Sequence, residues 1–120
     1  MSIVIQLFAT LVALEFLFIM YLETFATTSD RTSKVFSMSK EELARQSVNT
    51  LFKNQGIYNG LLAVLILLAV FVFNSQIAVT ILMSYIILVA LYGSMTSNPK
   101  IIFMQGGLAI ITLILSLMIH

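Results

Sequence analysis

The chain has 120 residues, of which 60% are hydrophobic and only 9% are charged, and its formal net charge is +1. A soluble domain carries roughly 25% charged residues, so this composition excludes a water-soluble globular protein and indicates a lipid bilayer as the surroundings. There is no cysteine, a single histidine and no basic patch interleaved with aromatic residues. The sequence therefore predicts no disulfide, no metal site, no cofactor and no nucleic-acid partner.

Four apolar segments follow one another along the chain. A helix that crosses a bilayer needs about 20 predominantly apolar residues, and open sheet edges are not tolerated in hydrocarbon. The sequence therefore predicts an all-α membrane protein, a four-transmembrane-helix bundle formed by one domain. The expected spans cover residues 3–25, 52–73, 77–96 and 101–119 of the 1–120 domain.

The first expected span carries two acidic residues, Glu15 near its middle and Glu23 near its end. A charged carboxylate at the depth of Glu15 costs roughly 2.5–3.5 kcal/mol on insertion scales. Glu15 is therefore either a carboxylate that carries a proton or binds a cation, or a protonated side chain that bonds a neighbouring helix. We expect Glu23 to reach water or to pair with a basic residue of the following loop. The two acids are about 12 Å apart along the axis, so any joint role is sequential.

Residues 26–51 form the only long polar connection, and they contain the string Ser39-Lys40-Glu41-Glu42. This string is typical of a capping box in which Ser39 accepts a hydrogen bond from the Glu42 amide. Met38 and Leu43 stand where a hydrophobic staple would place them. The sequence predicts a short amphipathic helix at the membrane interface that leads into the second span.

The second span opens with two amide side chains, Gln55 and Asn59, one helical turn apart. Such side chains bridge helices inside membranes, and Asn59 is equally consistent with a ligand contact. Gly56, Gly60 and Ala63 form a stripe of small residues that lets another helix approach closely.

The third and fourth spans each carry one polar stripe. Tyr85, Tyr92 and Thr96 share a line on the third, and Gln105, Thr112 and Ser116 share a line on the fourth. Either four polar faces converge on a central site, or the stripes only hold the helices together. In the first case Tyr58, Tyr85 and Tyr92 are candidates for cation–π contacts with a ligand.

All six lysines and arginines lie in the first and third loops or, for Lys53, at the entry of the second span next to the first loop. Positively charged loops stay in the cytoplasm, so a four-span chain places these loops inside and both termini outside.

Several strings of the sequence resemble the family of small bacterial membrane proteins known as domain of unknown function 1304. They are Ala13-Leu14-Glu15, Tyr21-Leu22-Glu23, Asn54-Gln55-Gly56-Ile57-Tyr58-Asn59-Gly60, Leu91-Tyr92-Gly93 and Phe103-Met104-Gln105-Gly106. The resemblance implies a bacterial inner-membrane protein of four spans and assigns no activity to it. In this family a histidine often follows the first glutamate, whereas Phe16 stands here, which weakens a Glu–His acid/base mechanism.

The leading hypothesis is binding or transport of a small lipophilic or cationic solute at an acidic site centred on Glu15. The alternatives are an intramembrane enzyme that acts on a lipid or isoprenoid, and an accessory or assembly protein without its own activity. The enzyme is less favoured because no nucleophile or nearby second acid accompanies Glu15, so no catalytic residue is assigned. Association into a homo-oligomer remains open. The candidate ligand or proton site residues are Glu15, Glu23, Gln55, Tyr58, Asn59, Tyr85, Tyr92 and Gln105.

Overall fold

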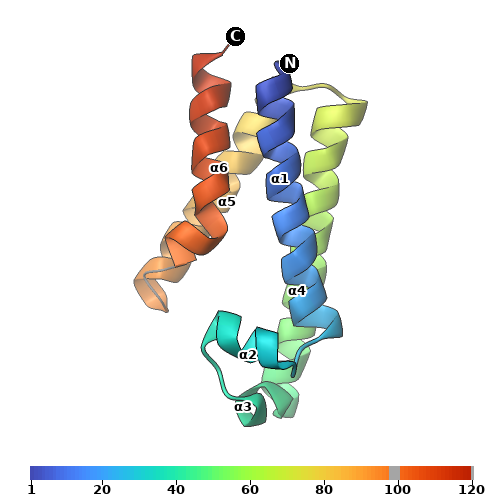
Figure 1. Cartoon of the computed structure of the whole chain (residues 1–120), viewed down its shortest axis with the longest axis vertical. Coiled ribbons are helices and arrows are strands. Elements are labelled where there is room, and N and C mark those ends of the chain that lie inside the picture. Colours follow the sequence, from blue (N-terminus) through green and yellow to red (C-terminus); the bar gives the residue numbers. More distant parts are fainter. Residues whose placement is uncertain (98–100, 120) are drawn as a thin grey trace. The chain divides into compact units, whose positions relative to one another are not determined.

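The computed structural model describes residues 1–97 and 101–119, and all regular structure in them is helical (Figure 1). Two of the apolar helices end in a single π-turn, named η1 and η2. The elements are α1 (Ile3–Met20), η1 (Tyr21–Phe25), α2 (Asp30–Phe36), α3 (Lys40–Ala44), α4 (Gln46–Leu67), η2 (Leu68–Val72), α5 (Gln76–Thr96) and α6 (Ile101–Met118). The predicted all-α class is confirmed.

Three continuous helical stretches are long and apolar enough to cross a membrane. They are Ile3–Phe25, Gln46–Val72 and Gln76–Thr96, with 23, 27 and 21 residues. At 1.5 Å per residue even the shortest extends over roughly 31 Å, which matches the hydrocarbon core of a bilayer. The apolar part of α6 within the described residues, Phe103–Met118, is shorter than these three.

The second of these stretches begins earlier than the expected span at residue 52. It starts at Gln46, directly after Arg45, whose backbone is extended (φ −63°, ψ 135°). The expected amphipathic helix is therefore divided at Arg45 into α3 and the first turns of α4. Nothing between Gln46 and Leu51 breaks a helix, so the amphipathic turns continue into the apolar ones.

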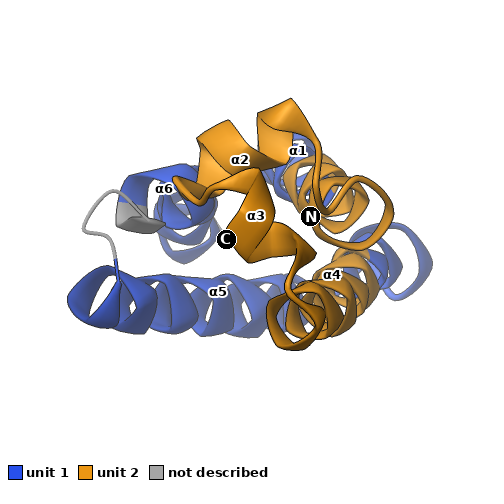
Figure 2. Ribbon diagram, turned by 90° about the horizontal axis from the view of Figure 1, so that it is seen from below, with its two compact units in different colours: residues 1–13, 64–120 blue, residues 14–63 orange. Residues whose placement is uncertain are grey.

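The chain forms two compact units (Figure 2). Unit 1 consists of residues 1–13 and 64–120, and α5 and α6 pack against each other within it. Gln76 Nε2 donates to the carbonyls of Ser116 (2.8 Å) and Ile119 (2.6 Å), which lie at the end of α6. Thr80 Oγ1 lies 3.0 Å from Ser116 Oγ. In unit 1, polar side chains thus join the start of α5 to the end of α6.

Unit 2 consists of residues 14–63 and holds the short helices α2 and α3. Ser29 begins α2 by accepting from the Thr32 amide, and Ser37 ends it in the left-handed region (φ 55°). Ser39 Oγ accepts from the Glu42 amide at 3.1 Å, which confirms that part of the expected capping box. Leu43, the residue after Glu42, is fully buried.

Two side-chain contacts tie these short helices to their surroundings. The rings of Phe36 and Phe52 meet edge to face at 5.1 Å and join α2 to α4. An exposed ion pair between Lys40 and Asp30 joins α3 to α2, and Lys40 holds the pKa of the Asp30 carboxyl below its usual range. The sequence did not predict α2 as a separate helix.

Candidate functional site

A buried acidic cluster lies in unit 2, where η1 meets the middle of α4. The side chain of Glu23 is fully buried (0% exposed). Its two carboxyl oxygens each accept one amide: Gln55 Nε2 donates to Oε2 at 2.9 Å and Asn59 Nδ2 donates to Oε1 at 2.6 Å. Gln55 and Asn59 are one turn apart on α4, so they reach the same carboxyl from one face of that helix. These three residues are called the Glu23 cluster below.

The backbone around Glu23 is held in place by threonines. A π-turn closes i→i+5 bonds, such as Ala26 N to Tyr21 O at 2.9 Å, and so disturbs the regular pairing of nearby carbonyls. Thr27 Oγ1 donates to the carbonyl of Glu23 at 2.7 Å. The buried Thr32 donates to the carbonyls of Ala26 (2.6 Å) and Leu22 (3.2 Å). These hydroxyls stabilise η1 and fix the direction in which the Glu23 side chain leaves the helix.

Close contact between η1 and α4 depends on two glycines. A Cβ atom at Gly56 would lie 2.0 Å from Thr24 Oγ1 and 3.1 Å from Glu23 Cβ. A Cβ atom at Gly60 would lie 2.2 Å from Met20 Sδ. Thr24 Oγ1 also donates to the carbonyl of Lys53 at 2.9 Å. The small-residue stripe expected on the second span therefore brings Gln55 and Asn59 within reach of Glu23.

The charge of Glu23 has no basic partner in the described part of the chain. The ion pairs found there are Lys40–Asp30 and Arg45–Glu42, both on the short helices or beside them. The expectation that Glu23 reaches water or a basic loop residue is therefore wrong, because burial removes the water and two neutral amides take its oxygens. An ionised carboxyl offers about four acceptor positions, and the amides occupy two of them. When it is ionised, Glu23 therefore keeps two acceptor positions that no described residue is seen to fill.

Glu15 differs from Glu23 in its surroundings. Its side chain is half-buried, and its Oε1 atom is buried without a hydrogen-bond partner among the described residues. Gln55 and Asn59, which were predicted as members of a site centred on Glu15, bond Glu23 instead. In the structure the amides therefore assemble around Glu23 and not around Glu15.

The remaining candidate residues are not part of the Glu23 cluster. Tyr58 lies between Gln55 and Asn59 on α4, but it is 77% exposed, whereas Glu23 is fully buried. Tyr85 and Tyr92 on α5 are 56% and 69% exposed, and Gln105 on α6 is half-buried. These last three belong to unit 1.

The threonines around η1 were missed as site residues. Thr24 and Thr27 stand one residue and four residues after Glu23, and the second spacing is one at which a hydroxyl bonds a helix carbonyl. That spacing is a sequence signal that could have identified Thr27. Thr24 bonds the backbone of Lys53, for which the sequence carries no signal.

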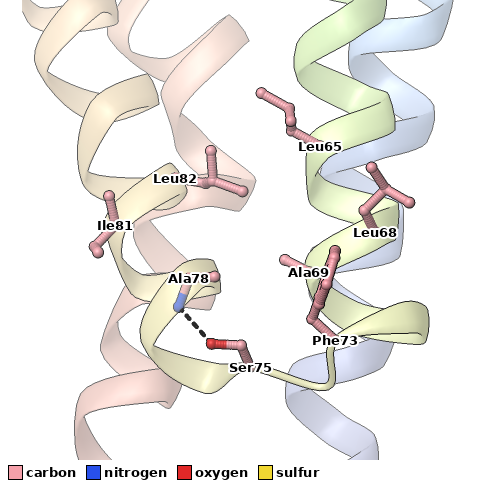
Figure 3. Close-up of a pocket in the computed structure, with 8 residues that line it drawn as sticks. All are labelled: Leu65, Leu68, Ala69, Phe73, Ser75, Ala78, Ile81 and Leu82. Carbon is pink, nitrogen blue, oxygen red and sulfur yellow. Dashed lines mark hydrogen bonds between the residues drawn. The ribbon is translucent and has the colours of Figure 1, made fainter.

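Two grooves in unit 1 are separate from this cluster. The larger, of about 620 Å³, lies between the end of the second apolar stretch and the start of α5 (Figure 3). Its lining is apolar apart from Ser75, whose Oγ is already bonded to the Ala78 amide. The smaller, of about 500 Å³, adjoins Gln76, Thr80 and Ser116, which bond each other. Neither groove is lined by an acidic residue.

Comparison with known proteins places the chain in one family. The model of the family described as "Protein of unknown function (DUF1304)" matches residues 10–117. The chain is 61% identical over 117 residues to "Uncharacterized protein YpaA" of Lactococcus lactis subsp. lactis (strain IL1403). The aligned region covers 97% of this chain and 98% of that protein. No solved structure matches the chain. The matched residues extend from α1 to α6 and include the whole Glu23 cluster, and the chain belongs to the DUF1304 family of proteins of unknown function.

Proposed function

We propose that this chain is a four-span protein of the bacterial inner membrane that binds a small lipophilic cation at the Glu23 cluster. The observation that carries the proposal is the burial of an acidic side chain beside two neutral amides, with no basic partner among the described residues. Buried charges in proteins are normally paired or bound to a cation. Ionisable residues within membrane spans mark solute and ion pathways by default.

The two amide side chains of the cluster differ in their exposure. Gln55 is exposed, whereas Asn59 is half-buried. A ligand can therefore reach Glu23 by displacing the Gln55 amide, while Asn59 keeps the carboxyl in position. A lipophilic cation suits such a site, because its charge compensates Glu23 and its apolar body replaces lipid contacts.

The test is binding of tetraphenylphosphonium to the purified protein in detergent. We expect Glu23→Gln to weaken binding at least about tenfold, a loss of about 1.4 kcal/mol or more, since it removes the charge and keeps the shape. Glu41→Gln is the matched control, because Glu41 is an exposed acid on α3. Equal binding by wild type and Glu23→Gln would show that the cluster does not bind cations.

A second candidate is an accessory or assembly protein in which the cluster only joins two helices. It is favoured by the fact that both oxygens of Glu23 already accept a hydrogen bond from within the protein. In that case Glu23→Gln lowers stability and no cation binds to either form. The binding measurement therefore separates the two candidates.

The proposed topology places α6 as the fourth span, with both termini and residues 74–76 outside. It is supported by the positions of the lysines and arginines, five of which lie in the first and third loops, while Lys53 lies near the end of the second span that follows the first loop. Because the chain has no cysteine, single-cysteine variants give unambiguous labelling. In intact cells a membrane-impermeant maleimide should label Ser2→Cys, Ser75→Cys and a cysteine added after residue 120, but not Lys34→Cys. Protection of the added C-terminal cysteine would show three spans instead of four.

A further inference from the structure

Glu15 lies in the same apolar stretch as Glu23 but is not part of the Glu23 cluster. Its Oε1 atom is buried and has no hydrogen-bond partner in the part of the chain that the structure describes. A polar atom without a partner inside a membrane span costs several kcal/mol by order of magnitude. Such an atom in a native protein needs an explanation, and a bound ion is one of those known.

Part of the Glu15 side chain is also exposed at the surface of α1. The side chain is half-buried, so part of it lies at the surface although Oε1 faces inward. Leu14 and Phe18, which flank it on α1, are both exposed. In a spanning helix an exposed apolar face contacts lipid, so Glu15 is reached from the bilayer, whereas Glu23 is covered by Gln55.

The π-turn changes the angle around the helix axis between Glu15 and Glu23. In an uninterrupted α-helix, positions eight residues apart differ by roughly 80° around the axis and about 12 Å along it. A π-turn closes i→i+5 bonds and winds less per residue, so η1 brings Glu23 closer to the line of Glu15. One ammonium group cannot contact both carboxyls at that distance, and so it would occupy them in turn.

We infer that Glu15 is a separate site, entered from the bilayer, for the ammonium group of a lipophilic amine that then moves to Glu23. The inference rests on the function proposed above. An ammonium group supplies the N–H donor that Oε1 lacks, together with a charge opposite to that of the carboxylate. Its apolar part remains against the leucine and phenylalanine side chains that flank Glu15 on α1.

The test is carboxyl labelling, located by mass spectrometry of peptides. Dicyclohexylcarbodiimide, which dissolves in the bilayer, should add to Glu15 in the wild type and in Glu23→Gln. A water-soluble carbodiimide should label the exposed Glu41 and leave Glu15 unlabelled. Phenethylammonium should slow the labelling of Glu15 about tenfold, as expected from occupancy of about 90%. Glu15→Gln serves to confirm the position of the adduct.

Three results would overturn the inference. One is a lack of dicyclohexylcarbodiimide adduct on Glu15, and another is labelling that phenethylammonium does not slow. Protection that grows with protein concentration instead of amine concentration would show that a second copy of the chain covers Glu15, and it would also overturn the inference. Labelling reports on Glu15 directly, whereas tetraphenylphosphonium binding by Glu23→Gln reports on the proposed function, so each can fail without the other.

Discussion

Replacing Gly56 with alanine should destabilise the protein by about 2–3 kcal/mol, more than the same change at Gly60 or Gly107. The added methyl would lie 2.0 Å from Thr24 Oγ1 and 3.1 Å from two Cβ atoms, so a short side chain and backbone must shift. Moving Thr24 also breaks its 2.9 Å hydrogen bond to the Lys53 carbonyl. At Gly60 the closest atom is the end of the flexible Met20 side chain, which can rotate away.

Gly107→Ala is the matched control, because no atom lies within 4 Å of a Cβ placed there. The measurement is unfolding of the three variants in mixed detergent micelles, followed by circular dichroism. Adding Thr24→Ala to Gly56→Ala should recover part of the loss, since it removes the atom in closest contact. If Gly56→Ala and Gly107→Ala unfold alike, η1 and α4 do not pack as closely as the structure shows.

The features that could be predicted from the sequence depend on composition and local spacing. The excess of apolar residues indicates long membrane-compatible helices, and the structure contains three such helices. The cap at Ser39 follows from a four-residue string and is formed by those residues. The spacing of Gly56 and Gly60 predicts one face for close packing, and both glycines are buried. The cap string and the glycine spacing each lie within about one helical turn of chain.

The partner of the two amides could not be predicted in this way. Gln55 and Asn59 are more than 30 residues from both Glu15 and Glu23, so sequence spacing does not choose between the acids. The choice depends on how far one helix is shifted along the other. Contacts of Gly56 with Thr24 and of Gly60 with Met20 set that shift, and they bring the amides to Glu23.

The π-turn at Tyr21–Phe25 also could not be predicted from the sequence. Its residues are mostly apolar like those of the rest of the stretch, and none of them is a glycine or proline that would mark an irregular turn. The turn is stabilised by hydroxyl groups outside it, chiefly Thr32, which is ten residues from one of the carbonyls that it bonds. The π-turn therefore depends on the folding of α2 back against η1, a tertiary contact.

Asn59→Leu should destabilise the protein by about 3 kcal/mol, more than Gln55→Leu, because it removes a donor from a buried carboxyl. Asn59 is half-buried and makes the shorter bond, 2.6 Å to Glu23 Oε1. After this change Oε1 has lost its donor, and the surroundings admit little water to replace it. Gln55 is exposed, so water or a lipid headgroup can take its place, and we expect a loss of only about 1 kcal/mol.

The double variant Glu23→Leu/Asn59→Leu distinguishes a lost hydrogen bond from a lost side-chain volume. If the single change is costly because a buried charge has lost its partner, removing the charge as well should restore most of the stability. Tyr58→Leu is the control on the same helix, since its side chain is 77% exposed. Unfolding of all four variants in mixed micelles gives the comparison. A double variant less stable than Asn59→Leu alone would show that Glu23 stabilises the helix pair by packing, not through its bond to Asn59.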